Sequence, residues 1–246
     1  MTGKIILSVG MPRAGSGWYY NLTHDLLVAA GFRDARQMRE RYHLGGILTE
    51  VNLNIGALTW RRVLMVLLPA ILGNTFAIKT HAGPTPLALF LIRKGLIKPT
   101  YIYRDPRDAL LSAYEYGQRA RENQRDNAFA RLETLEQAVD FMLAYVRVSE
   151  AWLACDRALH VRYEDFLKDY DSEVIRLAAF LGLPGDTPEV LDVSDRYRPE
   201  RGSPDQKGWH LSKGKIGRFR EVFNDRQKDL FAQVFGPYLE RMGYSI

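Results

Sequence analysis

Short apolar runs alternate with longer segments in which apolar residues recur at helical spacing. The short runs predict buried strands at residues 4–9, 75–79, 100–103 and 159–163. The longer segments predict helices at residues 18–30, 106–121, 135–155 and 172–181. Strands that alternate with helices in this way form a parallel sheet. The pattern therefore predicts an α/β fold, with a parallel sheet flanked by helices on both faces.

Three further segments are less regular. Residues 63–72 (VLMVLLPAIL) form the longest apolar stretch, which predicts a buried helix; it is well short of the ~20 residues that a membrane span requires. Arg61 and Arg62 precede it, so contact with a membrane surface stays open as an alternative. Residues 119–131 and 192–217 are polar, charged or rich in Gly and Pro, and we expect loops there that could act as lids.

Composition narrows the class of protein. The chain has 246 residues, which favours a single domain over residues 1–246. It has one cysteine, Cys155, and no apolar N-terminal run long enough for a signal peptide, so we expect a cytoplasmic protein. With 34 basic and 29 acidic residues the net charge is +5, which favours an anionic partner: nucleic acid or a small phosphorylated molecule.

The segment from Gly10 to Gly17 (GMPRAGSG) lies between the first predicted strand and the first predicted helix. Backbone N–H groups at a helix N-terminus bind anions, and glycines let a phosphate approach the backbone closely. The segment departs from the nucleotide-triphosphatase loop, because Ser16 and Gly17 stand where Lys and Ser or Thr are required. We interpret it as a phosphate-binding loop, with an ordinary tight turn as the alternative.

Four other clusters follow predicted strands or lie near the C-terminus. Lys79 and His81 end the second strand, where a base and a fixed cation suit proton abstraction and charge stabilisation. Arg104 ends the third strand, and Ser112 follows two helical turns later, so both could reach one phosphate. The other two clusters are 161–165 (VRYED) and 211–217 (LSKGKIG). Taken singly, each of the four clusters has an alternative interpretation as a surface ion-pair site or a solvated loop.

Other chemistries lack their residue patterns. The five histidines are scattered and none forms an i, i+4 pair, so no metal site is predicted. The Gly15-Ser16-Gly17 triplet lacks the spacing of a nucleophile elbow, which argues against a serine hydrolase. Basic residues at strand ends beside glycine turns favour a pocket over a nucleic-acid-binding face. We therefore expect a small-molecule partner and no nucleic acid.

Taken together and in order, the five clusters resemble the sulfotransferases that use 3′-phosphoadenosine 5′-phosphosulfate (PAPS). The family pattern is Pro-Lys-Ser-Gly-Thr-Thr-Trp, then Lys-Thr-His, then Arg-x-x-x-Asp-x-x-x-Ser, then Tyr-Glu-Asp, then Arg-Lys-Gly. The corresponding segments here are 12–18, 79–81, 104–112, 163–165 and 212–214. The resemblance implies a P-loop-like sulfotransferase fold, with PAPS as co-substrate, adenosine 3′,5′-bisphosphate (PAP) as product, and no metal.

The resemblance also implies a role for each matching residue. His81 would be the general base, and Lys79 and Arg13 would stabilise the transferred group. The phosphosulfate would bind to Arg13, Ala14, Gly15, Ser16 and Gly17, and the adenine would contact Trp18 and Tyr163. The 3′-phosphate would bind to Arg104, Ser112, Lys213 and Gly214.

The chain departs from the family pattern at several positions. Arg13 replaces the loop lysine, Ala14 and Gly17 replace hydroxyl residues, and Ser212 replaces an arginine. The replacements at Arg13 and Ser212 keep a homologue that binds nucleotide without turnover as an alternative. A phosphotransferase related to P-loop kinases is a further alternative, although it requires a loop lysine that is absent here. The apolar segments 44–72 and 84–97 predict a lipophilic or aromatic hydroxyl acceptor. The oligomeric state is left open.

Overall fold

A four-stranded parallel sheet organises the computed structural model, which describes residues 2–125, 127–185, 187–201 and 214–246. The strand order is β2-β1-β3-β4, so the chain crosses from one side of β1 to the other between β2 and β3. All pairings are parallel, as predicted. The strands are β1 (Ile5–Gly10), β2 (Phe76–Thr80), β3 (Ile97–Tyr103) and β4 (Leu159–Arg162).

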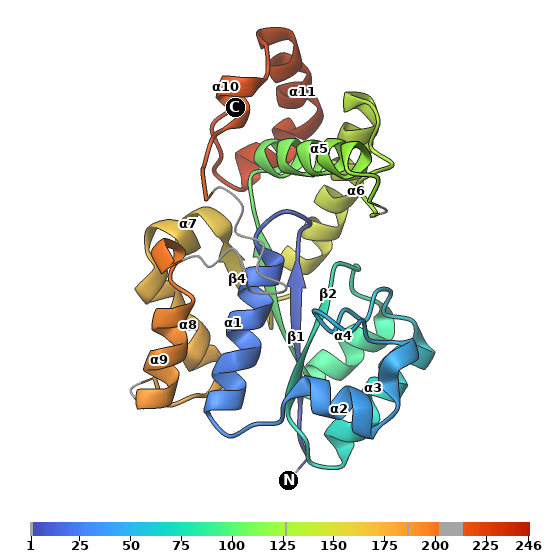
Figure 1. Ribbon diagram of the computed structural model, residues 1–246, viewed down its shortest axis with the longest axis vertical. Coiled ribbons are helices and arrows are strands. Elements are labelled where there is room, and N and C mark those ends of the chain that lie inside the picture. Colours follow the sequence, from blue (N-terminus) through green and yellow to red (C-terminus); the bar gives the residue numbers. More distant parts are fainter. Residues whose placement is uncertain (1, 126, 186, 202–213) are drawn as a thin grey trace.

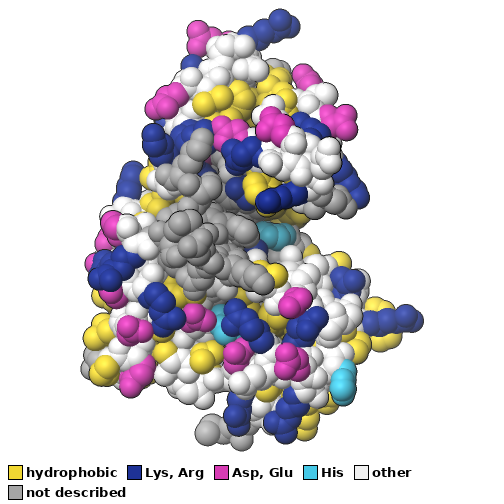
Figure 2. Space-filling view, viewed as in Figure 1, with side chains coloured by type: hydrophobic (Ala, Val, Ile, Leu, Met, Phe, Trp, Pro, Cys, Tyr) yellow, Lys and Arg dark blue, Asp and Glu magenta, His cyan; other side chains and the backbone are white. Residues whose placement is uncertain are grey.

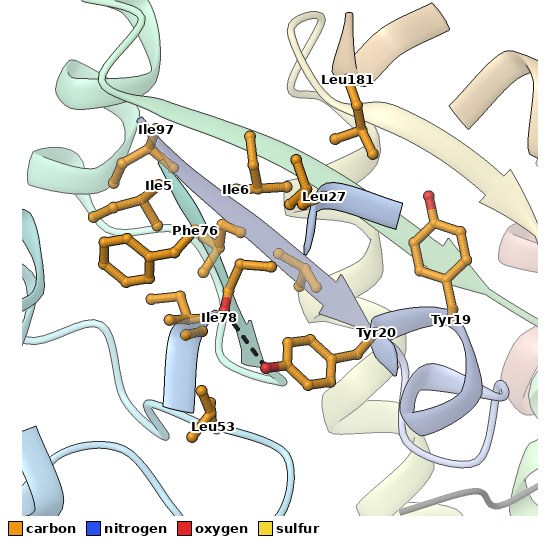
Figure 3. Packing of buried hydrophobic residues seen from close by; sticks show 14 of the residues in the cluster. Ile5, Ile6, Tyr19, Tyr20, Leu27, Leu53, Phe76, Ile78, Ile97 and Leu181 are labelled. Atoms are coloured by element: carbon orange, nitrogen blue, oxygen red, sulfur yellow. Dashed lines mark hydrogen bonds between the residues drawn. The ribbon is translucent and has the colours of Figure 1, made fainter. Parts of the chain in front are cut away.

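The central strand β1 is buried along its whole length, as expected for a strand covered by helices on both faces. Ile5 lies between Phe76 of β2 and Ile97 of β3 in register. Figure 3 shows these side chains packed together, with Tyr19 and Tyr20 approaching from α1. The Tyr20 hydroxyl donates to the Ala77 carbonyl at 3.5 Å. This packing fixes the sheet on which the strand-end residues are carried.

Helices cover both faces of the sheet (Figure 1). One side carries α1 (Ser16–Ala29), α8 (Tyr170–Leu181) and α9 (Pro188–Arg196), and α1 contacts both of the others. On the other side lie α3 (Trp60–Ile71), which contacts β1, and α4 (Pro86–Arg93) and α6 (Leu135–Leu153), which contact β3. Short helices complete this part: α2 (Ala35–Arg41), α7 (Tyr163–Lys168), and 3-10 turns at Leu44–Gly46 and Pro199–Arg201.

A second hydrophobic cluster lies beyond the carboxyl ends of the strands, in the upper part of Figure 1. Here α5 (Pro106–Glu122) packs on α6, and the C-terminal helices α10 (Phe219–Val222) and α11 (Asp225–Arg241) join them. Asp105 caps α5 by accepting the Arg107 N–H at 2.9 Å, and Pro106 opens the helix, as predicted. The strand-end residues therefore lie between the sheet and this second cluster.

Two predictions from the pattern are wrong. The apolar stretch 63–72 is a helix but is not buried: only one side of α3 packs on the core, and Leu64, Leu68 and Leu72 are about half exposed. Residues 192–196 belong to α9 and are not a loop, because Val190 and Val193 pack against the core at helical spacing. In the described residues, no helix is long and apolar enough to cross a membrane.

Candidate active site

One cavity at the carboxyl ends of the strands gathers residues from six distant segments of the chain. Figure 2 shows the molecule hollowed on one side, with a histidine side chain visible in the hollow. Five Lys or Arg side chains line the cavity, and no Asp or Glu is among its described lining residues. They are Arg13, Lys79, Arg104, Lys215 and Arg218. Such a lining attracts a ligand with several negative charges.

The first wall is the loop between β1 and α1. Arg13 and Gly15 have left-handed backbone conformations, with φ of 65° and 72°. A Cβ at Gly15 would lie 2.8 Å from the Tyr163 ring, so only glycine fits there without displacing the ring. Because α1 begins at Ser16, the N–H groups of its first turn have no carbonyl partner within the helix. The loop therefore presents backbone donors and the positive end of a helix dipole to the cavity.

The second wall comes from the end of β2, where Lys79 and His81 both line the cavity. Lys79 is 6% exposed, and no ion pair or side-chain hydrogen bond is recorded for its ammonium within the described part of the chain. Burial, reinforced by the charge of Arg13, lowers the pKa of Lys79 to about 8. A cation in this environment is stabilised when an anion approaches it.

His81 is held in one tautomer by the backbone. Its Nδ1 lies 2.6 Å from the Gly10 carbonyl oxygen, which can only accept, so Nδ1 carries the proton. Burial and the neighbouring Lys79 charge lower the pKa of His81 to about 3, although the Gly10 carbonyl opposes this shift. The imidazole is therefore neutral near pH 7, and its Nε2 lone pair is the basic atom.

Arg13 lies in an aromatic setting on the α5 side of the cavity. Its guanidinium carbon is 4.6 Å from the centre of the Tyr116 ring and 5.7 Å from that of Phe129, and its Nε donates to the Ser112 hydroxyl at 3.1 Å. Burial lowers the pKa of Arg13, partly opposed by Tyr116. The direct bond shows that Arg13 and Ser112, which the family resemblance assigns to opposite ends of one ligand, are neighbours.

The third wall joins Arg104 to the C-terminal segment. The Arg104 guanidinium donates to the carbonyls of Arg13 (3.3 Å) and Lys215 (2.8 Å) and to the Asp108 carboxylate (3.3 Å). Asp108 also accepts the backbone N–H groups of Gly217 at 2.6 Å and Phe219 at 3.1 Å. Asp108 therefore ties the segment that contains Gly214 and Lys215 to the cavity.

Tyr163 forms the floor between these walls. The Arg104 guanidinium carbon lies 4.5 Å from the centre of its ring, and the ring lies against the backbone of Gly15. Glu164, the next residue, is buried and accepts the Asp105 N–H at 3.0 Å and the Tyr244 hydroxyl at 3.1 Å, so it fixes this corner. Tyr163 thus presents an aromatic face beside a fixed cation.

The sequence model of the sulfotransferase domain matches residues 4–243. The chain belongs to the sulfotransferase family. A guinea pig (Cavia porcellus) 3-alpha-hydroxysteroid sulfotransferase is 27% identical over 193 residues, which span 68% of this chain and 64% of that protein. The matched part is therefore less than two thirds of that relative's length.

Solved structures show that the sulfotransferase fold extends over nearly the whole chain. A mouse sulfotransferase complexed with PAP has a TM-score of 0.61 and 16% identity, with 97% of this chain and 85% of that chain covered. Retinol dehydratase in complex with androsterone and inactive cofactor PAP has a TM-score of 0.60 and 19% identity, with 96% and 80% covered. The predicted α/β fold with a phosphate-binding loop is confirmed.

The cavity of this family member brings together most of the residues that the sequence singles out. Trp18 and Ala14 are not among the residues that line it. The Trp18 indole is buried against Phe166 and donates to the Tyr197 carbonyl at 2.9 Å, and the Ala14 N–H donates to the Met11 carbonyl at 3.2 Å. Lys213 lies outside the described residues. The cavity is lined by Arg13, Gly15, Ser16, Gly17, Lys79, His81, Arg104, Ser112, Tyr163 and Gly214.

The sequence reasoning assigned no role to two of the lining residues, Phe129 and Arg218, and it included Lys215 only as part of the cluster 211–217. Arg218 is held by Glu115 through two hydrogen bonds, of 2.6 and 3.2 Å. Lys215 stands inside the Lys-Gly-Lys triplet, so its charge was a signal available in the sequence. Phe129 and Arg218 had no local signal, because each reaches the cavity only through the packing of the second cluster.

No group of three or more His, Cys, Asp or Glu side chains that could hold a metal is found among the described residues.

Proposed function

We propose that this protein transfers a sulfuryl group from PAPS to the hydroxyl of a small lipophilic or aromatic acceptor. The observation that carries the proposal is the cavity itself: five basic side chains and a neutral, oriented imidazole meet at the N-terminus of α1, and none of the described lining residues is a carboxylate. PAPS carries negative charge at its 3′-phosphate and at its phosphosulfate. Its charge matches a lining that is basic at both ends.

The lining suits each part of PAPS. The backbone of Gly15, Ser16 and Gly17, with the helix N-terminus, would hold the 5′-phosphate. Arg104, Ser112 and Gly214 would hold the 3′-phosphate, and Tyr163 would contact the adenine. Lys213 would also contact the 3′-phosphate. Ala14 and Trp18, which the resemblance assigns to the phosphosulfate and the adenine, would instead support the loop and the adenine side from outside the described lining. Arg13, bonded to Ser112, would lie between the two charged ends.

His81 and Lys79 would perform the chemistry. The His81 Nε2 would accept the proton of the acceptor hydroxyl as its oxygen bonds to sulfur and as the bond from sulfur to the phosphate oxygen breaks. Lys79 and Arg13 would face the charge that develops on the leaving phosphate. Burial is the larger cause of the lowered pKa of His81, and the Lys79 charge is the second. A bound anion beside Lys79 would offset the second cause and so raise the pKa of His81.

The acceptor would enter beside the end of β2. Residues 53–58 are bonded to this strand end: the Lys79 N–H donates to the Leu53 carbonyl at 3.1 Å, and the Thr80 hydroxyl donates to the Gly56 carbonyl at 2.7 Å. This apolar segment therefore lies next to His81. A lipophilic acceptor is also supported by relatives: structures of retinol dehydratase contain androsterone or retinol, and the guinea pig relative is a 3-alpha-hydroxysteroid sulfotransferase.

A kinase-like reaction is less well supported, because the loop lacks the Lys-Ser/Thr pair that positions phosphates and magnesium. A protein that binds the nucleotide without turnover is the better supported of the two alternative functions, because Arg13 replaces the loop lysine. We also propose a cytoplasmic location, because the one cysteine, Cys155, is free and buried, which suits a reducing compartment.

The test is transfer of ³⁵S from labelled PAPS to hydroxysteroids, retinol and simple phenols, with calorimetric titration of PAP on the same preparation. We expect labelled product with at least one hydroxyl acceptor, and none with the acceptor's methyl ether. PAP binding without transfer to any acceptor would favour the homologue without turnover. Absence of PAP binding would contradict the proposal altogether.

A further inference from the structure

The outer face of α3 exposes large apolar side chains to solvent. Six of them are between 47% and 60% exposed: Trp60, Leu64, Met65, Leu68, Ile71 and Leu72. No polar residue interrupts the sequence from Val63 to Leu72. Apolar patches of this kind on folded proteins mark interaction sites, whereas single exposed apolar residues are normal. We name these six residues the α3 face.

The orientation of α3 is fixed by its other side. Val63, Val66 and Ala70 are buried in the core, and the helix contacts β1. The Arg62 guanidinium also donates to the Ile55 carbonyl at 3.0 Å, which anchors the helix start. Rotation of the helix to hide the α3 face would expose these core residues. The exposure is therefore built into the packing.

The segment that carries the α3 face is basic. Between Val51 and Arg104 the chain has seven Lys or Arg and no Asp or Glu, although the whole chain has 29 acidic residues. Three of these seven basic residues are exposed: Arg61, Arg93 and Lys94. Arg61 lies over the Trp60 ring at 5.2 Å, and Lys94 over the Phe90 ring at 5.6 Å. The helices that carry them, α3 and α4, lie on the same side of the sheet (Figure 1).

This combination of apolar and basic side chains indicates which kind of partner the α3 face binds. A second copy of the chain would bring the same basic residues against these, and like charges repel. Anionic lipid headgroups instead attract Arg and Lys, while the acyl boundary accepts Leu, Ile and Met. Trp is the side chain that favours the headgroup level. The helix has 12 residues, about 18 Å, so it is too short to cross the ~30 Å apolar core of a bilayer.

We propose that the α3 face docks this protein on the surface of an anionic lipid bilayer, with α3 lying along the membrane plane. Leu64, Leu68 and Leu72 enter the acyl boundary, and Trp60 and Arg61 lie at the headgroup level. This binding needs no nucleotide and is independent of the proposed reaction.

The test is flotation of the full-length protein with vesicles of phosphatidylcholine, with and without phosphatidylserine. We expect binding only to the vesicles with phosphatidylserine, and a loss of about tenfold or more in the double variant Leu64→Gln/Leu68→Gln. The matched control is Ile175→Gln/Leu191→Gln, which changes two residues that are 68% and 54% exposed on α8 and α9, on the other side of the sheet. The control should bind like the wild type.

A second readout keeps the proposal testable if a variant loses stability. The chain has four tryptophans, so Trp209 is first replaced by Phe. Brominated lipids should quench the tryptophan fluorescence of Trp209→Phe, and Trp60→Phe/Trp209→Phe should lose that quenching, because Trp18 and Trp152 are buried. PAP affinity should be equal in all variants. Failure of the wild type to bind phosphatidylserine vesicles would overturn the proposal. So would equal losses in both double variants, or an α3-face substitution that only dissociates a dimer.

Discussion

The two ends of the cavity hold their charges differently. At the β2 end, Lys79 and His81 have no carboxylate partner recorded in the described structure, and the pKa of each is lowered, to about 8 and about 3. At the α5 end, carboxylates hold the guanidinium groups: Asp108 binds Arg104, and Glu115 binds Arg218. Within the described residues, the positive charge at the β2 end has no resident carboxylate to compensate it. At the α5 end carboxylates compensate part of the positive charge and hold the guanidinium groups in place.

This difference suits two tasks. A group that must respond to charge developing in a reaction is most effective without a resident counter-ion, since its interaction then strengthens in the transition state. A group that must hold a phosphate in one place benefits from a partner that fixes its geometry. In the proposed reaction the β2 end therefore performs transfer, and the α5 end holds the 3′-phosphate.

The largest effect should come from His81. Replacement by Ala should lower kcat for sulfuryl transfer by about 10²–10⁴-fold, the range typical for loss of a general base, while PAP affinity changes little. Steady-state kinetics and PAP calorimetry measure the two quantities.

A matched variant separates the base from the anchor. In His81→Asn the side-chain amide can still donate to the Gly10 carbonyl, but the variant has no basic nitrogen. We expect His81→Asn to be as inactive as His81→Ala. Recovery of transfer in the Asn variant would mean that His81 only shapes the loop.

Lys79 should give a smaller and pH-dependent effect. Because its folded-state pKa is lowered to about 8, its charge is present below pH 8 and is lost above it. PAP should therefore bind more weakly, by about tenfold for the loss of ~1.4 kcal/mol, as pH rises from 7 to 9. Calorimetry across this range should show that PAP affinity declines in the wild type. In Lys79→Met, PAP affinity should not change with pH. A decline that persists in Lys79→Met would assign it to another group.

The smallest effect should come from the holding end. Asp108→Asn puts an N–H group against donors from Arg104, Gly217 and Phe219, which should lower the free energy of unfolding by about 1–3 kcal/mol and weaken PAP binding. Asp192→Asn is the matched control, because Asp192 forms an exposed i, i+4 pair that contributes about 0.3–0.5 kcal/mol. Equal unfolding midpoints for the two variants in urea would contradict the proposal that Asp108 tethers the C-terminal segment.

The sheet was predictable because its strands are buried on both faces and read as continuous apolar runs. Their ends shift by up to three residues: β3 begins at Ile97 where residue 100 was predicted, because Lys98 and Pro99 interrupt the apolar run yet still pair with β1. The exposure of the α3 face was not predictable, because an apolar residue on the outer side of a helix has the same sequence signature as a buried one.

The site was predictable where motif residues carry their own chemistry, as at Lys79, His81 and Arg104. The environment of Arg13 was not: its contacts with Tyr116 and Phe129 depend on how α5 and the following segment pack. At Trp18 the motif predicted too much. Trp18 belongs to the motif, but it donates to the Tyr197 carbonyl and packs in the core, and it does not line the cavity.

The most direct measurement compares PAP with adenosine 5′-monophosphate, which lacks only the 3′-phosphate, by calorimetry on the wild type and on Arg104→Ala. The wild type should bind PAP at least about tenfold more tightly, a difference of ~1.4 kcal/mol, and Arg104→Ala should abolish most of that difference while binding the monophosphate almost unchanged. Equal affinity of the wild type for both nucleotides, or an equal loss of both in Arg104→Ala, would contradict a cavity built for a doubly phosphorylated adenosine.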